Sequence, residues 1–206
     1  MSYSQYNQDL EVVEFYKSKK NGYFVDIGAY DGVEYSNTYL LEKDYDWKGI
    51  CIEPTPYNFD KLVENRPNSA CINKACYSKS NTKVPFSIAN NFDMLSGISH
   101  CIDSFHVDEV NSNKTEIFVE TITLNDVLKE NDAPSFIDYL SLDTEGSEFE
   151  ILQKFRFSDY IFGIIHVEHN FVEYNRLRIQ NLLLSNNYAY IKESHYDDFY
   201  IHKSQL

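Results

Sequence analysis

One stretch decides the fold: Tyr23-Phe24-Val25-Asp26-Ile27-Gly28-Ala29-Tyr30-Asp31-Gly32. It is an apolar run that ends in an acid and a glycine-rich turn, which is typical of the first β-strand of a nucleotide-type site. A second apolar run, residues 47–52, is again followed by a carboxylate, Glu53. Two strands that each carry an acid at the carboxyl end indicate a site for an adenosine-bearing cofactor.

Segments of strand length alternate with segments of helical periodicity along most of the chain. The predicted strands are residues 23–27, 49–52, 69–77, 136–142 and 161–167, and the predicted helices are residues 6–20, 36–44, a helix that starts near Pro56, 124–129, 147–154 and 176–184. This alternation requires right-handed crossovers and a parallel sheet. Residues 188–192 and 199–202 flank the turn His195–Asp198 and predict a closing antiparallel hairpin. The expected architecture is an open, doubly wound α/β sheet.

The region between residues 84 and 120 departs from this alternation. Two strand-like pieces, Val84–Ile88 and Glu116–Thr121, flank a polar, loop-rich segment at residues 89–113. We interpret residues 84–120 as an insertion on the substrate side of the site. At 206 residues, the chain is expected to form a single domain, residues 1–206.

Composition excludes several classes of protein. The formal net charge is −14, so a general affinity for nucleic acid or for an anionic membrane is disfavoured. The four cysteines form no C-x-x-C pair, which is typical of reduced thiols inside a cell. The amino terminus lacks the charged and apolar regions of a signal peptide, and no apolar run has the length of a membrane span. We therefore expect a soluble, cytoplasmic protein.

The first two strand ends supply the first set of candidate site residues. The spacing Asp26-x-Gly28-x-x-x-Gly32 differs from the dinucleotide fingerprint G-x-G-x-x-G. The glycines allow a ligand to approach the backbone closely, and Asp26 can accept from a cation or a water; tight packing of strand on helix is the other explanation of the glycines. Glu53 is placed to accept both hydroxyls of a ribose, or it is a solvated carboxylate at a strand end.

Polar residues also follow the third and fourth strands. The stretch Asn73-Lys74-Ala75-Cys76 either faces an adenine ring or packs at its strand end. Asp143 and Glu145 follow the strand at residues 136–142, at the sheet edge where ligands bind in such folds. Asp143 is a candidate general base, acceptor for a cofactor amine, or metal ligand. Glu148 is better explained by the first turn of the next helix, where an acid complements the helix dipole.

The fifth strand ends in His166-Val167-Glu168-His169-Asn170. This is not the zinc-protease motif H-E-x-x-H, and it lacks the helix which that motif requires. We interpret Glu168, His169 and Asn170 as a polar cap aimed at the same edge as Asp143. His169 is therefore a catalytic candidate, and a hydrogen-bonded structural role is the alternative.

With these residues laid out, the chain resembles the FkbM-type methyltransferases, a family of S-adenosylmethionine-dependent enzymes. The matching stretches are Tyr3–Asp9, Phe24–Gly32 with Ser36–Thr38, Trp47–Pro54, Thr123–Asp126, Ile137–Glu148 and Glu168–Asn170. The run Asp-Thr-Glu-Gly-Ser-Glu at residues 143–148 is the most specific of them. Residues 89–113 match no pattern of the family, so the identity of the methyl acceptor stays open.

The resemblance implies a Rossmann-like class I methyltransferase fold, with a mostly parallel seven-stranded sheet and a C-terminal antiparallel hairpin. It assigns Asp26, Gly28 and Gly32 to the methionine end of S-adenosylmethionine and Glu53 to its ribose. It also places Asp143 near the sulfonium and the acceptor. The cofactor-binding residues that it implies are Asp26, Gly28, Gly32, Ser36, Glu53, Pro54, Asn73, Ala75 and Asp143, with the turn at residues 73–76 against adenine.

The expected activity is O-methylation of a hydroxyl on a small molecule or a sugar. Because a sulfonium is already a good leaving group, the protein must align the acceptor and remove its proton. Asp143, Glu145 and His169 are the candidates, acting directly or by holding a divalent cation such as Mg²⁺ that lowers the pKa of the hydroxyl. One alternative is a nucleic-acid or cap methyltransferase, which the net charge disfavours. The other is a catalytically silent binding module, which has no need for the full set of acids and glycines.

Overall fold

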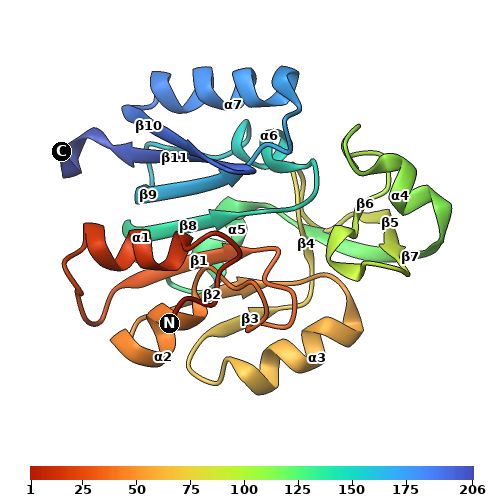
Figure 1. Cartoon of the computed structure of the whole chain (residues 1–206), viewed down its shortest axis with the longest axis horizontal. Helices are drawn as coiled ribbons and strands as arrows, with labels where there is room; N and C mark the ends of the chain where they lie inside the picture. Colours follow the sequence, from red (N-terminus) through yellow and green to blue (C-terminus); the bar gives the residue numbers. More distant parts are fainter.

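The computed structural model describes residues 1–206 and contains two β-sheets flanked by helices (Figure 1). The larger sheet has seven strands in the order β10-β11-β9-β8-β1-β2-β3. Its strands are β1 (Tyr23–Ile27), β2 (Lys48–Ile52), β3 (Ala70–Ile72), β8 (Phe136–Leu142), β9 (Ile161–Glu168), β10 (Tyr188–Ser194) and β11 (Asp197–His202). Only the two pairings of β11 are antiparallel. The predicted Rossmann-like sheet with its C-terminal antiparallel hairpin is confirmed.

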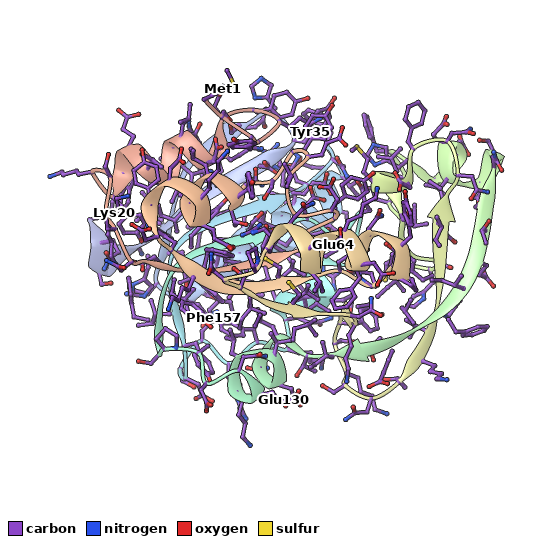
Figure 2. The ribbon with its side chains drawn as sticks, turned by 90° about the horizontal axis from the view of Figure 1, so that it is seen from below. Met1, Lys20, Tyr35, Glu64, Glu130 and Phe157 are labelled. Atoms are coloured by element: carbon purple, nitrogen blue, oxygen red, sulfur yellow. The ribbon has the colours of Figure 1, made fainter.

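Helices cover both faces of this sheet. On one face lie α1 (Gln8–Phe15), α2 (Tyr39–Tyr45) and α3 (Pro56–Asn65), and on the other lie α5 (Leu124–Glu130), α6 (Glu148–Leu152) and α7 (Glu173–Ser185). Figure 2 shows the sheet from its edge, with α2 and α3 on one side and α5, which ends at Glu130, on the other. None of the helices combines the length and the apolar surface that crossing a bilayer requires.

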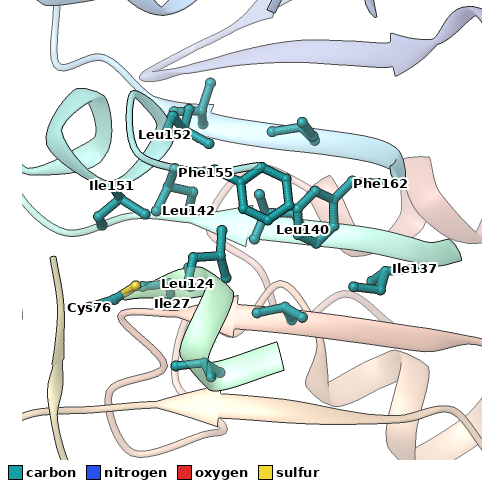
Figure 3. Packing of buried hydrophobic residues seen from close by; sticks show 14 of the residues in the cluster. Ile27, Cys76, Leu124, Ile137, Leu140, Leu142, Ile151, Leu152, Phe155 and Phe162 are labelled. Atoms are coloured by element: carbon teal, nitrogen blue, oxygen red, sulfur yellow. The ribbon is translucent and has the colours of Figure 1, made fainter. Parts of the chain in front are cut away.

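The core explains why strands β1, β8 and β9 are apolar on both faces. Phe24 packs into the cluster under α1–α3, whereas Val25 and Ile27 belong to the larger cluster under α5–α7. Figure 3 shows this larger cluster, in which Leu140 of β8 and Phe162 of β9 lie beside Phe155, which follows α6 in the chain. Each such side chain contributes about 1.5–3 kcal/mol when it leaves water. The two faces together fix the carboxyl ends of the strands at one edge.

The smaller sheet is built from the middle of the chain. It has the order β4-β7-β5-β6, with β4 (Ala75–Cys76), β5 (Lys83–Ala89), β6 (Gly97–Ile98) and β7 (Lys114–Ile122). Two short 3-10 helices, Asp93–Leu95 and Lys203–Gln205, and helix α4 (Val107–Ser112) complete the elements. Figure 1 shows this sheet and α4 beyond the carboxyl ends of β1 and β8. Residues 89–113 therefore contain more regular structure than the sequence indicated.

Several predicted boundaries were wrong; α2 begins at residue 39 instead of 36, and α7 begins at residue 173 instead of 176. The strand expected at residues 69–77 is two strands in different sheets, β3 and β4, because the Asn73 amide donates to the carbonyls of Glu53 and Pro54 and turns the chain. The first helix ends at Phe15, since Lys17 and Ser18 adopt φ of 50° and 60°. The final turn is also shorter than expected, because residues 197 and 198 already belong to β11.

Candidate functional site

A cavity of about 240 Å³ lies where the carboxyl ends of β1, β2, β8 and β9 meet the smaller sheet. Its wall combines strand-end residues of the large sheet with Phe86, Asp93–Ser96, Ile98 and His106 from the middle of the chain. The acids that line it are Asp26, Glu34, Glu53, Asp93, Asp143, Glu145 and Glu168, and no lysine or arginine is among the lining residues. The cavity wall is therefore rich in carboxyl groups that no lysine or arginine neutralises.

Asp26 lies in this wall near the end of β1. Its Oδ2 accepts from the Thr38 hydroxyl at 2.6 Å, and Ser36, which also lines the cavity, lies in the same loop. Burial raises the pKa of Asp26, against the opposing effects of the Arg66 charge and the Thr38 hydrogen bond. Arg66 is itself buried and donates to Glu42 at 2.7 Å and to the Thr38 hydroxyl at 2.9 Å. This network fixes the loop after β1 against α2 and α3.

The two glycines after β1 serve packing as well as the cavity wall. Gly28 lines the cavity at φ +87°, and a Cβ placed there would lie 1.8 Å from the carbonyl oxygen of Asp143. Gly32, at φ +82°, does not line the cavity; a Cβ there would meet Arg66 and Leu62. The close approach at both positions is made by the protein itself, so the loops after β1 and β8 can touch.

Glu53 lies at the end of β2 with its carboxylate held from three sides. It accepts from the backbone N–H of Tyr30 at 3.2 Å, from that of Thr55 at 2.8 Å, and from the Thr55 hydroxyl. Burial raises the pKa of Glu53 to about 7, against the opposing effect of these hydrogen bonds. Pro54 lines the cavity beside it. A rigid acceptor that titrates near neutral pH thus faces the cavity.

The turn that was expected against adenine is only partly in the cavity wall. Ala75 and Cys76 line the cavity, but Asn73 does not. The Asn73 Nδ2 donates to the carbonyl of Glu53 at 2.9 Å and to that of Pro54 at 3.2 Å. Asn73 therefore shapes the loop after β2 and acts on the cavity through that loop.

Three carboxylates meet at the ends of β8 and β9. One oxygen from each of Asp143, Glu145 and Glu168 lies within 4.8 Å of the other two. Burial, reinforced by repulsion from the neighbouring acids, raises the pKa of Asp143 and of Glu168 well above the ordinary values. The Oε2 of Glu168 is buried and has no hydrogen-bond partner. All-oxygen donors of this kind suit a hard divalent cation.

Two further residues hold Glu145, and the sequence did not single out either for this role. The Nδ1 of His106 lies 2.8 Å from the Glu145 Oε2, and the Asn170 Nδ2 donates to the same oxygen at 3.2 Å and to Asp103 at 2.9 Å. Burial acts to lower the pKa of His106, but the hydrogen bond and charge of Glu145 outweigh it and the pKa is raised. His106 comes from the segment before α4, which carried no recognisable motif.

His169 lies apart from the other candidates. It lines a small neighbouring cavity instead of the main one, and its Nε2 is 3.8 Å from the Asp198 Oδ1. Its Nδ1 accepts from the backbone N–H of Phe171 at 3.0 Å. The structure therefore brings Asp143 and Glu145 together with Glu168 and places His169 outside the main cavity.

Glu148 has the local role that its position predicted. Its Oε1 accepts from the backbone N–H and hydroxyl of Thr144, at 2.8 and 2.7 Å, and from the N–H of Gly146 at 3.1 Å. It braces the loop that carries Asp143 and Glu145 at the start of α6.

This fold, with its ligand cavity at the carboxyl ends of the strands, defines a class I methyltransferase-like protein. The chain matches the methyltransferase FkbM domain over residues 26–191, and it belongs to that family. Membership implies S-adenosylmethionine as the methyl donor. A search of curated proteins found no match.

Solved structures share the fold at low sequence identity. The methyltransferase FkbM from Methylobacillus flagellatus is 16% identical with a TM-score of 0.55 over 89% of this chain, which spans only 44% of that protein. Precorrin-6y C5,15-methyltransferase from Geobacter metallireducens is 11% identical with a TM-score of 0.50, covering 94% of this chain and 85% of its own. The METTL16 methyltransferase domain is 11% identical with a TM-score of 0.51, covering 95% and 65%.

Proposed function

We propose that this protein transfers a methyl group from S-adenosylmethionine to a hydroxyl of a small, uncharged acceptor such as a sugar. The observation that carries the proposal is the single cavity that joins Asp26 and Glu53, which family resemblance assigns to the cofactor, with the carboxylates of Asp143 and Glu145. Cofactor and acceptor could then meet inside one enclosed space, which is the requirement for in-line transfer.

The cofactor half of the proposal follows the order of the strands. Glu53 accepts the ribose hydroxyls, while Pro54 and Ala75 lie against the adenine. Asp26 and Ser36 hold the methionine end, which carries an ammonium group that an acid attracts. Gly28, Gly32 and Asn73 shape the loops that present these groups. When bound, the cofactor supplies a methyl group on a sulfonium that is ready to leave.

The acceptor half relies on the carboxylates after β8. Transfer would form a bond between the acceptor oxygen and the methyl carbon while the carbon–sulfur bond breaks, and the hydroxyl proton would pass to a carboxylate of Asp143 or Glu145. Asp143 and Glu145 stabilise the loss of that proton, with His106 and Asn170 fixing the position of Glu145. Because His169 lies outside the cavity, it has no part in the proposed chemistry.

The chemistry of the cavity wall favours an uncharged acceptor. With seven acids and no lysine or arginine in the wall, a phosphorylated or nucleic-acid acceptor would be repelled. Next to the cavity, Phe105 and Phe171 are each 52% exposed and contact the ring of Tyr196, which lines the cavity. Such rings suit the apolar face of a sugar. We further propose that residues 84–120 form a substrate-side insertion within one domain, since several of them line the cavity.

The test is calorimetric titration of the full chain with S-adenosylmethionine and with S-adenosylhomocysteine. Micromolar affinity, about −8 kcal/mol, is expected for both. Hydroxylated acceptors are then screened by release of S-adenosylhomocysteine. Absence of cofactor binding by the folded protein would contradict the proposal and favour a catalytically silent module. Salt-sensitive RNA binding together with RNA methylation would favour the nucleic-acid alternative.

A further inference from the structure

Three acids from two neighbouring parallel strands converge, and only Glu145 among them contacts a basic side chain, His106. Asp143 directly follows β8, Glu145 lies two residues further on, and Glu168 is the last residue of β9. Strands β8 and β9 are paired in register up to Leu142 and Val167, so their next residues are brought together at the same edge. The convergence is thus a direct result of the sheet topology.

The charge of this cluster is not balanced by the protein. No lysine or arginine lines the cavity, and His106 reaches only Glu145. Glu168 is 8% exposed, and its Oε2, which no solvent reaches, accepts no hydrogen bond. An acceptor left in this state carries its full desolvation penalty, which is larger when the acceptor is charged. The free protein therefore keeps a buried oxygen that requires a positively charged or protonated partner.

We propose that Asp143, Glu145 and Glu168 bind one divalent cation of the Mg²⁺ type. All three donors are carboxylate oxygens, which hard cations prefer to sulfur or nitrogen. A single shared proton would bridge only two of these carboxyl groups, whereas a divalent ion contacts all three. The inference rests on the proposed function for its chemical role, because a cation here lowers the pKa of an acceptor hydroxyl that coordinates it.

Cation binding is measured on the full chain without cofactor or acceptor, so that the two proposals can fail separately. Mn²⁺ is titrated at mildly alkaline pH and followed by loss of the free-ion signal in electron paramagnetic resonance, and Mg²⁺ is added as competitor. We expect saturable binding of one Mn²⁺ per chain that Mg²⁺ displaces. Glu168→Gln should weaken binding at least by the roughly 10–100-fold that loss of outer-shell partners costs. Asp143→Asn should do the same.

The matched control is Glu34→Gln, which removes a carboxylate from the same cavity wall but outside the cluster. It should leave Mn²⁺ affinity unchanged. Circular dichroism and thermal unfolding check that each variant is folded; Glu168→Gln should not destabilise the protein, because it removes a buried charge that lacks a partner.

Three results would overturn the inference. They are no saturable Mn²⁺ binding by the folded wild type, equal affinity in wild type and Glu168→Gln, and equal losses in Glu168→Gln and Glu34→Gln. If Mn²⁺ does not bind but S-adenosylmethionine does, with an affinity that depends on Glu168, the cluster holds the positive charge of the cofactor instead and the proposed function stands. If Mn²⁺ binds as expected but the cofactor does not, only the proposed function fails.

Discussion

Glu53 gives cofactor binding a pH dependence near neutrality. Its pKa is raised to about 7 by burial, so the ionised form, which we propose accepts both ribose hydroxyls, becomes the major form above about that pH. We predict that affinity for S-adenosylmethionine rises about tenfold between about pH 6 and about pH 8. Glu53→Gln should weaken binding by about 1.5–3 kcal/mol at the upper pH and flatten the profile. Calorimetry over this range checks both; a wild-type profile retained in the variant would reject the ribose assignment.

The same residue makes a prediction for stability in the absence of ligand. Because the pKa of Glu53 in the folded state lies above its ordinary value of 4.5, the folded protein binds more protons than the unfolded chain between these two pH values. This group therefore lowers stability as pH rises from about 4.5 to about 7. At about pH 8, Glu53→Gln should restore about 1 kcal/mol of stability, which corresponds to a rise in Tm of about 2–4 °C. A lower Tm at that pH would show that the three hydrogen bonds outweigh burial.

Gly28 links two loops of the site by contact alone. A Cβ at this position would overlap the Asp143 carbonyl oxygen, and φ is +87°. We predict that Gly28→Ala costs about 2–4 kcal/mol in free energy of unfolding and also lowers cofactor affinity. Gly97→Ala is the control. A Cβ placed at Gly97 would lie 3.3 Å from its nearest neighbour, Ile102 Cγ1, and its φ is not in the left-handed region. Urea unfolding of both variants makes the comparison; equal losses would count against the role of Gly28.

Site residues at strand ends were predictable, and those on irregular segments were not. Asp26, Glu53 and Asp143 stand where an apolar strand stops, which the sequence displays directly. His106 reaches the site from a segment with no periodic pattern, through a contact with Glu145 that is 39 positions away. Strand alternation sends Glu168 and His169 to opposite faces, so Glu168 borders both cavities whereas His169 borders only the small one.

Among the elements, the contact of α2 with α3 rests on a buried ion pair. The Arg66 Nε lies 2.7 Å from the Glu42 Oε2, and both side chains are at most 5% exposed. Arg66→Met leaves Glu42 as an uncompensated buried charge and should cost about 3–5 kcal/mol. The exposed pair Arg156–Asp159 provides the control, since Arg156→Met should cost less than about 1 kcal/mol. Urea unfolding distinguishes them; a small effect at Arg66 would mean that water enters the pair.

Strands β1, β2, β8 and β9 of the large sheet were predicted to within a residue, because their apolar runs are long and unbroken. Strands β1 and β8 begin and end where the sequence pattern placed them. The smaller sheet was predicted only in part, since its strands β4 and β6 have two residues each and depend on tertiary pairing. The division of the expected third strand depended on one side-chain amide, Asn73. The hydrophobic periodicity of the sequence gives no sign of such a contact.

At the scale of the whole molecule, a net charge of −14 opposes compactness. Self-repulsion of this kind is screened by salt. We predict that Tm rises with NaCl, by about 2–4 °C between about 0.02 M and about 0.2 M, as about 1 kcal/mol of repulsion is removed. The measurement is thermal unfolding with a chelator present, so that divalent cations do not contribute. A Tm independent of NaCl would mean that the acids are already balanced within the fold.

The path of the chain into and out of the smaller sheet has a consequence for how this protein could diversify. The chain enters that sheet in β4 and leaves it at the end of β7, and the two strands are paired there, Ala75 with Thr121 and Cys76 with Ile122. The segment between β4 and β7 therefore begins and ends at neighbouring positions of the smaller sheet. Such an excursion can be lengthened, shortened or exchanged with little strain on the strands that carry Asp26 and Glu53. A protein of this fold could thus change its methyl acceptor by replacing the segment between β4 and β7, while the strands proposed to bind the cofactor stay the same.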